Sequence, residues 1–275
     1  MKKTIMRAAL AAAALTAALP GSAFAIQGGD VVTDGDFANV AILRFVDSSD
    51  PATRWRCSGT LVAPDVIITA AHCTEGPVDT VYYSFANEVA TTSEPPAGAG
   101  WTFGASNAGT LPGTIHTDPA WDGDLQLNEL DDIGVIELAE PVHGIEPAEI
   151  APLGYLDHVR TGTVFTVAGY GVSFDKPTSS GPQKPVADNL RVKRWTTAPM
   201  SNITRDTIKL ATNPKDGRAG GGTCFGDSGG PIFLGGYLVG VTSWGTSQFC
   251  KAGQAGYQRL DTQDAYDFYA PLVYG

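Results

Sequence analysis

Short apolar runs separated by turn residues are the dominant pattern along this chain. The runs are rich in Val, Ile, Leu and aromatic residues and are bounded by Gly, Pro, Asp or Asn, which is typical of β-strands. The strands predicted in this way are Val40 to Val46, Gly59 to Val62, Val66 to Thr69, Val81 to Phe85, Gly134 to Leu138, Val164 to Ala168, Pro231 to Leu234 and Leu238 to Ser243.

A helix is expected only near the carboxyl end, from Asp261 to Tyr269, where Asp and Thr precede a run containing Tyr266 and Phe268. The residues from Glu88 to Gly113 are rich in Ala, Gly, Thr and Pro and indicate a long surface loop. No internal repeat is evident. With 33 glycines and 18 prolines, the pattern predicts an all-β barrel or sandwich, as one large domain or two small ones.

The amino end has the layout of a secretory signal peptide. Lys2, Lys3 and Arg7 precede an apolar run from Ala8 to Leu19, and the small-residue site Ala23-Phe24-Ala25 follows. A membrane anchor is the alternative, but this run is much shorter than the ~20 residues that a helix needs to cross a bilayer. We therefore predict that residues 1–25 are removed and that the mature protein is secreted, extracellular and without a membrane partner.

The chain is acidic, with a formal net charge of −11. Removal of residues 1–25 takes away only positive charges and leaves the product more acidic. Because an acidic surface repels nucleic acid and anionic lipid, neither is an expected partner.

Four cysteines, Cys57, Cys73, Cys224 and Cys250, lie in the exported part. An oxidising compartment favours disulfides, and four cysteines allow three pairings. Metal binding is the alternative, but none of the four forms a closely spaced pair of the kind found in zinc sites. We expect no metal ion and no cofactor.

Three motifs carry the candidate chemistry. A serine lies among glycines in Gly226-Asp227-Ser228-Gly229-Gly230-Pro231, where glycine lets the backbone approach a substrate closely. A histidine, His72, ends a β-type run beside Cys73, as a rigidly held general base would. Between them Asp131-Asp132 leads into an apolar strand. The order His, Asp, Ser is one of the known chain orders of the hydrolytic triad.

With these motifs, the chain from Ile26-Gln27-Gly28-Gly29 to the terminal helix resembles the chymotrypsin and trypsin family of serine proteases. The resemblance implies two six-stranded antiparallel Greek-key β-barrels, at about residues 26–140 and 141–275, with the active site in the cleft between them and a C-terminal helix. It implies a serine endopeptidase that acts on protein or peptide substrates. Protein protease inhibitors are possible partners, and we expect a monomer.

The resemblance also assigns roles to single residues. Ser228 would attack the carbonyl carbon, His72 would take and return the proton, and Asp132 would orient His72. The backbone N–H groups of Gly226 and Ser228 would form the oxyanion hole. Asp131 is expected to be a solvated loop acid. The other histidines, His116, His143 and His158, have no motif and are expected at the surface.

Further assignments rest on the same resemblance. Cys57 would pair with Cys73, and Cys224 with Cys250. Ile26 resembles the activated N-terminus of the family, whose amine pairs with the acid before the catalytic serine, here Asp227. Because Ile26 directly follows the expected cleavage site, export itself would create this amine. The alternative is that Ile26 merely begins a strand.

The resemblance also locates the substrate pocket, with Gly222 at the floor, Thr223 beside it, Gly245 and Ala255 on the walls, and Ser243 and Trp244 on the strand that pairs with substrate. Trp244 could equally belong to the core. Without an acid at the floor we expect an uncharged, apolar residue before the cut, because an unpaired buried cation costs several kcal/mol. Asp216 is expected in a surface loop.

Two other functions are compatible with parts of the pattern. A catalytically silent homologue that binds a partner would usually lack a triad residue, and none is lacking here. An esterase of the α/β-hydrolase type would place Gly-x-Ser-x-Gly between a strand and a helix, whereas Pro231 opens a predicted strand and Ser228 follows the His and the Asp.

Overall fold

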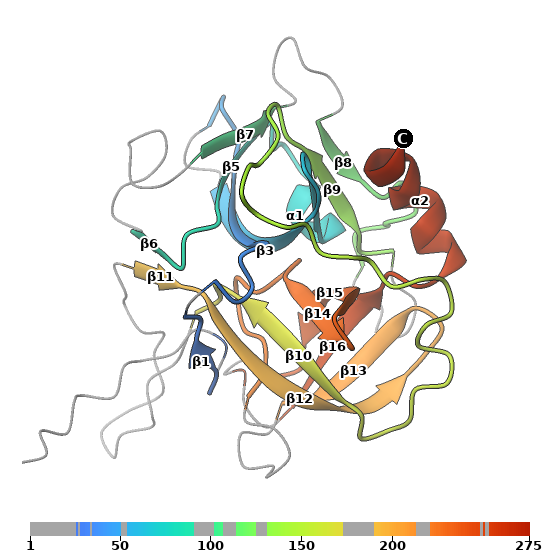
Figure 1. Ribbon diagram of the computed structural model, residues 1–275. Helices are drawn as coiled ribbons and strands as arrows, with labels where there is room; N and C mark the ends of the chain where they lie inside the picture. The colour runs from blue at the N-terminus through green and yellow to red at the C-terminus, as the bar shows by residue number, and fades with distance from the viewer. Residues whose placement is uncertain are drawn as a thin grey trace, which may run out of the picture.

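The structure, a computed structural model, describes residues 26, 28–33, 35–50, 54–90, 102–106, 114–124, 131–172, 190–212, 221–247, 250 and 253–275. Two antiparallel sheets, one from each half of the chain, form the body of the molecule (Figure 1). The elements are β1 (Asp30–Val31), β2 (Val40–Val46), β3 (Arg54–Ala63), β4 (Val66–Thr69), α1 (Ala71–Thr74), β5 (Thr80–Ser84), β6 (Glu88–Ala90), β7 (Thr102–Ser106), β8 (Ile115–Thr117), β9 (Gly134–Glu137), β10 (Val164–Gly169), β11 (Leu190–Val192), β12 (Arg194–Ile203), β13 (Thr207–Ala211), β14 (Pro231–Leu234), β15 (Tyr237–Gly245), β16 (Gln254–Arg259) and α2 (Gln263–Tyr274).

The N-terminal sheet is a curled sheet of seven strands in the order β7-β5-β2-β3-β4-β9-β8. Its concave side encloses a core that includes Leu43, Phe45, Leu61, Ile67 and Ile136. The sequence predicts a closed barrel of six strands here. The pairings among the described residues instead leave the sheet open between β7 and β8.

The C-terminal sheet is closed. Its order is β1-β12-β10-β14-β15-β16-β13, and an additional pairing of β12 with β13 joins the ends into a six-stranded barrel with β1 attached to β12. Phe165, Val167, Ile208, Ile232 and Tyr257 fill its interior. The predicted class, an all-β protein built from two barrel-like halves with a C-terminal helix, is therefore confirmed, with one half curled rather than closed.

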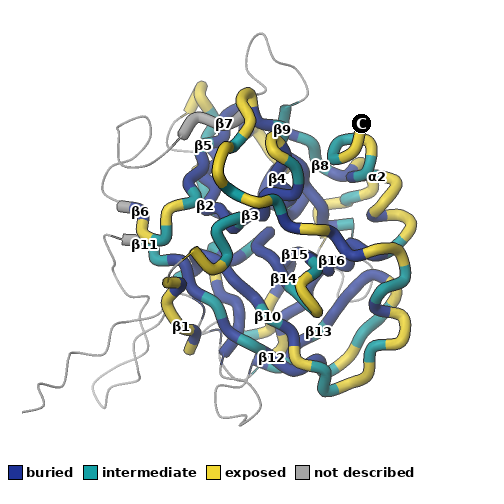
Figure 2. The backbone as a smooth tube through the Cα atoms, in the orientation of Figure 1, coloured by how far each residue is buried: buried dark blue, intermediate teal, exposed yellow. Residues whose placement is uncertain are grey.

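Helix α2 links the two halves (Figure 1). Thr262 caps its amino end by accepting a hydrogen bond from the backbone N–H of Ala265. Ala265 and Tyr269 pack against Ile68 and Val135 of the N-terminal sheet and Val241 of the C-terminal barrel. Buried positions accordingly run through both sheets while the outer face of α2 is exposed (Figure 2). In the part of the chain that the structure describes, no helix is long and apolar enough to cross a membrane.

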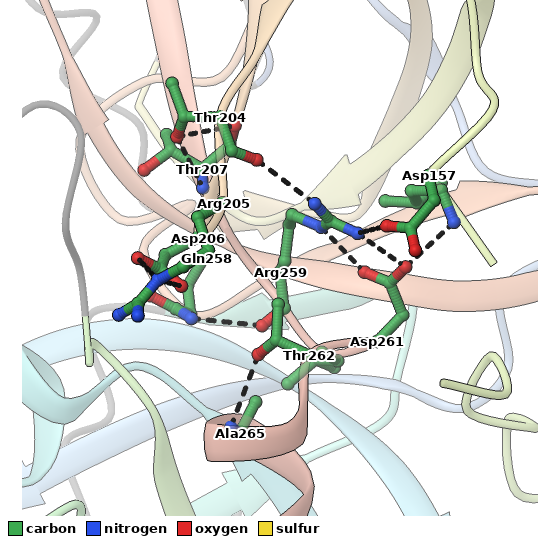
Figure 3. Close-up of polar contacts among 12 residues, drawn as sticks. Asp157, Thr204, Arg205, Asp206, Thr207, Gln258, Arg259, Asp261, Thr262 and Ala265 are labelled. Atoms are coloured by element: carbon green, nitrogen blue, oxygen red, sulfur yellow. Dashed lines mark hydrogen bonds and ion pairs between the residues drawn. The ribbon is translucent and has the colours of Figure 1, made fainter. Parts of the chain in front are cut away.

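An ion-pair network beside α2 is buried around Arg259 (Figure 3). The Arg259 guanidinium contacts both carboxylate oxygens of Asp261 at 2.9 Å and Oδ1 of Asp157 at 3.0 Å, and it donates to the carbonyl of Thr204. Asp261 also accepts the backbone N–H of Leu156 at 2.8 Å. The network therefore fixes the start of α2 to two loops of the C-terminal barrel.

Three sequence-based predictions need correction. The residues from Glu88 to Gly113 are not one loop, because Glu88–Ala90 forms β6, paired with β11, and Thr102–Ser106 forms β7, paired with β5. Backbone pairing with a neighbouring strand outweighs the weak strand preference of Gly, Ala and Ser there. The helix begins at Gln263 and extends to Tyr274. His116 is half-buried, with Nε2 2.7 Å from Glu137, whereas His143 and His158 are exposed as expected.

Candidate active site

His72 lies on the single turn α1, which follows the end of β4, an inner strand of the N-terminal sheet. The Cys57–Cys73 disulfide joins this turn to β3. Trp55 strengthens the attachment, because its indole N–H donates to the carbonyl of Cys73 at 2.8 Å. The sulfur atoms near the imidazole are thus bonded to each other and are not free to hold a metal ion. The result is a histidine whose backbone is held from both sides.

Asp132 is fully buried and accepts hydrogen bonds on both carboxylate oxygens. Nδ1 of His72 lies 2.8 Å from Oδ2, and the backbone N–H of His72 donates to Oδ1 at 2.9 Å. The hydroxyl of Ser243 donates to Oδ2 at 2.5 Å. These contacts require the proton of a neutral His72 ring to reside on Nδ1, which leaves Nε2 as a proton acceptor.

Ser228 lies in the tight loop between Cys224 and β14, and it is partly exposed. Its carbonyl accepts the backbone N–H of Ser58, on β3, at 2.8 Å. The next residue, Gly229, has a φ of +72°, and a Cβ atom there would overlap the hydroxyl of Thr69. Only glycine lets the loop that carries Ser228 approach the N-terminal sheet this closely. His72 and Ser228 line the same pocket.

The backbone around Gly226 is oriented by carbonyl hydrogen bonds. The carbonyl of Phe225 accepts the N–H of Val172 at 2.7 Å, and the carbonyl of Asp227 accepts the N–H of Gly230 at 2.8 Å. In a trans peptide the N–H and C=O groups point in opposite directions. The N–H groups of Gly226 and Ser228 therefore point away from Val172 and Gly230, and Gly226 itself has a φ of +96°.

Asp227 is completely buried beneath this loop. Oδ1 accepts the N–H of Gly171 at 2.7 Å, and Oδ2 accepts that of Cys224 at 2.8 Å. Burial raises the pKa of Asp227 to about 7, against the opposing effect of these two hydrogen bonds.

A pocket of about 280 Å³ opens beside Ser228. Of the residues that the resemblance assigns to it, Thr223, Ser243, Trp244, Gly245 and Ala255 line it. Gly222, which the resemblance places at the floor, is not among the described lining residues, and a side chain there would overlap Thr212, which does line the pocket. Among the described lining residues His72 is the only ionisable side chain. The part of the pocket that the described residues line is therefore uncharged apart from His72.

Trp244 forms one wall of this pocket and packs directly on Gly256, where a Cβ atom would overlap the indole. Nζ of Lys209 lies 5.7 Å from the centre of the indole ring. Deeper in the pocket, the hydroxyls of Thr223 and Tyr257 are 3.1 Å apart. The walls are thus set by side chains that are themselves packed or hydrogen-bonded.

The remaining sequence-predicted residues are distributed as follows. Ile26 is buried in the core of the C-terminal barrel, and both expected disulfides, Cys57–Cys73 and Cys224–Cys250, are formed. Asp131 does not touch His72. It is half-buried, and its pKa is raised by burial and by Asp206 and Asp264 nearby. Residues 1–25 and Asp216 lie outside the described residues.

Four residues that sequence reasoning did not identify contribute to the site. Ser58 holds the loop that carries Ser228 through its backbone N–H and through its hydroxyl, which donates to the carbonyl of Gly226 at 2.9 Å. Thr212 and Gln254 line the pocket, and Tyr257 supports Thr223. The position of Ser58 directly after Cys57 is the one local signal for any of them.

The chain is similar to known proteins in sequence and in fold. The family model described as Trypsin matches residues 26–265. The chain is 32% identical to brachyurin of Leptuca pugilator over 72% of this chain and 79% of that protein, and 32% identical to a trypsin of Saccharopolyspora erythraea over 78% and 86%. The structure of HL collagenase superposes with a TM-score of 0.63 at 22% identity, covering 90% of this chain and 97% of that one.

Proposed function

Because the chain belongs to the trypsin family of serine proteases, we propose that it is a secreted serine endopeptidase that uses His72, Asp132 and Ser228 as its catalytic triad. The observation that carries the proposal is the pair formed by His72 and the fully buried Asp132, at 2.8 Å, in the pocket that contains Ser228. A half-exposed histidine held by a buried acid beside an accessible serine is the arrangement that nucleophilic acyl transfer needs.

The proposed reaction has two halves. Oγ of Ser228 attacks the scissile carbonyl carbon while Nε2 of His72 takes its proton, and the His72 imidazolium then protonates the leaving amine as the C–N bond breaks. Water next attacks the acyl-enzyme and gives its proton to His72. The ester bond to Ser228 then breaks, the His72 imidazolium returns its proton to Oγ of Ser228, and the acid is released. Asp132 stays ionised throughout and stabilises the imidazolium through Nδ1–H.

Negative charge develops on the carbonyl oxygen in both tetrahedral intermediates. We assign its stabilisation to the N–H groups of Gly226 and Ser228, which the carbonyl contacts of Phe225 and Asp227 orient before substrate binds. Loss of one such donor typically costs about 3 kcal/mol of transition-state stabilisation.

The pocket supports a preference for an uncharged, apolar residue before the cut. Its described lining offers no carboxylate to pair with Lys or Arg, and Ala255 and Trp244 present apolar surface. A cation would therefore lose its hydration without gaining a partner.

Activation would follow from removal of residues 1–25, giving Ile26 a free amine that pairs with Asp227. Two observations support this step. Asp227 is a buried acid whose pKa is about 7, and Ile26 has a φ of +43°, which is costly for a β-branched residue. Cleavage before Ile26 removes the preceding carbonyl group and with it about 1–3 kcal/mol of backbone strain.

Covalent labelling with diisopropyl fluorophosphate tests the proposal. The secreted protein should incorporate one label at Ser228, hydrolyse peptides and begin at Ile26 by N-terminal sequencing. Ser228→Ala should remove both label and hydrolysis while leaving the thermal unfolding midpoint unchanged. A folded protein that takes up no label would instead be a silent homologue, and a start elsewhere than Ile26 would contradict the activation step.

A further inference from the structure

The side-chain hydroxyl of Ser58 connects the end of β10 to the loop that carries Ser228. Ser58 lies on β3 and is fully buried. Its hydroxyl oxygen is 2.9 Å from the carbonyl oxygen of Gly226 and 3.2 Å from the backbone nitrogen of Tyr170. Because the Gly226 carbonyl can only accept and the Tyr170 N–H can only donate, the single hydroxyl proton is directed at Gly226. The three groups therefore form one continuous hydrogen-bond chain that ends at Gly226.

The carbonyl of Gly226 belongs to the peptide group that lies between the two proposed oxyanion donors. These donors are the N–H groups of Gly226 and Ser228, and the angle between them depends on the rotation of the Gly226–Asp227 peptide. Gly226 has a φ of +96° and no Cβ atom, so its own backbone preference does little to fix this rotation. Two hydrogen bonds fix it instead. The Ser58 hydroxyl donates to the carbonyl, and the Asp227 N–H donates to the carbonyl of Cys224 at 2.9 Å.

The Ser58 side chain is closely enclosed. A Cβ atom at Gly169 would lie 3.2 Å from the Ser58 hydroxyl oxygen, and one at Gly230 would lie 3.1 Å from Cβ of Ser58. The carbonyl of Ser58 also accepts the hydroxyl of Thr69, on β4, at 2.8 Å. Both halves of the molecule therefore restrict Ser58, and its hydroxyl has little freedom to turn away from Gly226.

Tyr170, which donates to the Ser58 hydroxyl, is itself anchored to the N-terminal half. Only 2% of its surface is exposed, and its phenol oxygen lies 2.9 Å from the carbonyl oxygen of Ala86 and 3.2 Å from that of Val40. Nζ of Lys193 lies 5.7 Å from the centre of the ring, within the range of a cation–π interaction. The hydrogen-bond chain that ends at Gly226 thus begins at a fixed residue.

We propose that Ser58 is a positioning residue for peptide hydrolysis, whose hydroxyl holds the Gly226–Asp227 peptide so that the N–H groups of Gly226 and Ser228 converge on the substrate oxygen. The inference rests on the proposed peptidase function. Donors that are oriented before the substrate binds need no rearrangement when negative charge develops on that oxygen. The Tyr170 N–H also polarises the Ser58 hydroxyl and so makes it a stronger donor.

Positioning and simple stabilisation predict different kinetics for Ser58→Ala. Negative charge on the substrate oxygen develops in the transition state and is absent from the bound substrate, so a positioning hydroxyl contributes to kcat and not to KM. Ser58→Ala should therefore lower kcat for an uncharged peptide substrate about tenfold with KM unchanged. This loss is smaller than the roughly 10²- to 10³-fold loss that follows removal of a direct oxyanion donor. A hydroxyl that only stabilises the fold would instead lower the thermal unfolding midpoint and leave the kcat of the folded enzyme unchanged.

A peptide boronic acid gives a second readout, because its tetrahedral adduct with Ser228 resembles the transition state. The inhibition constant of this compound should rise in Ser58→Ala by the same factor by which kcat/KM falls. Ser58→Gly removes the same hydroxyl and one more carbon atom. It should show the same loss of kcat if the hydroxyl alone carries the effect.

Thr60→Val is the matched control. Thr60 is fully buried on the same strand, and its hydroxyl has no hydrogen-bond partner among the described residues, so its loss should change neither kcat nor the boronic acid inhibition constant. A wild-type kcat in Ser58→Ala, a loss confined to KM, or failure of both Ser58 variants to fold would overturn this inference while hydrolysis by the wild-type protein stands. Absence of hydrolysis by the folded wild-type protein would overturn the peptidase proposal and this inference together.

Discussion

Ser243 and Asp132 are joined across the two halves of the molecule by a hydrogen bond of 2.5 Å. Ser243 lies on β15 of the C-terminal barrel, beside the pocket, and Asp132 immediately precedes Ile133 and β9 in the N-terminal sheet. The strand assigned to substrate binding is therefore tied to the acid that orients the base, so displacement of one half relative to the other disturbs both.

Removal of the Ser243 hydroxyl tests this tie. A hydrogen bond to a charged group contributes about 1.5 kcal/mol, so Ser243→Ala should lower kcat/KM for peptide hydrolysis roughly tenfold. Ser243→Thr keeps a hydroxyl and should recover part of the loss. Steady-state kinetics on one peptide measure both, and an Ala variant with wild-type kcat/KM would show that the tie has no catalytic role.

Gly256→Ala should impair substrate binding. The added methyl group overlaps the Trp244 indole and forces it into the pocket, so we expect KM to rise roughly tenfold while the protein stays folded. Trp244→Phe in the same chain gives the methyl group more room. The double variant should therefore lose less binding free energy than the two single variants lose in sum. Strictly additive losses would contradict the packing argument.

The titration of Asp227 predicts that the pH dependence of stability differs between the chain that still carries residue 25 and the chain that begins at Ile26. Its folded pKa of about 7 lies above the ordinary value of 3.8, because it is buried. With residue 25 attached, the folded state binds this proton more tightly than the unfolded state, so its stabilising contribution is complete below about pH 4 and is lost as the pH rises to about 7. A free Ile26 amine would stabilise the carboxylate and remove this loss.

Chemical denaturation between pH 4 and 8 measures the difference. A chain with one extra residue before Ile26 should lose stability with rising pH relative to its Asp227→Asn counterpart, and the chain that begins at Ile26 should not. Identical pH dependence in the two forms would exclude an ion pair between Ile26 and Asp227.

Arg259→Met should destabilise the fold by about 3–5 kcal/mol, because it leaves the fully buried Asp261 without its partner. Arg205→Met is the matched control. Arg205 also contacts an acid, Asp206, at 3.0 Å, but 73% of its side chain is exposed, so its loss should cost less than about 1 kcal/mol. Urea unfolding measures both, and comparable losses would show that burial does not decide the strength of the Arg259 network.

Local pattern is sufficient to predict some strands and insufficient for others. The bounds of β2, β4 and β14 are those predicted, because each is a run of apolar residues. Strand β16 was not predicted, since only Ala255 and Tyr257 alternate inward among Gly and Gln. Strand β12 contains Pro199, and a proline argues against a strand in a sequence-based prediction. Its pairing with β10 and β13 depends on how the chain folds in three dimensions.

The site residues differ in the same way in how far sequence predicts them. The motifs around His72 and Ser228 consist of neighbouring residues and can be recognised in the sequence. The roles of Thr212 and Tyr257 depend on which distant segments pack together, and no local pattern encodes this.

Because the site is divided between the two sheets, its residues are synthesised at different times. The ribosome completes His72 and Asp132 well before Ser228 and Ser243, and Ser228 depends on Ser58 and Thr69 of the earlier half for its loop position. With the proposed triad, a growing chain therefore holds the base and the acid before it holds the nucleophile, and hydrolysis cannot begin until the C-terminal barrel has been synthesised.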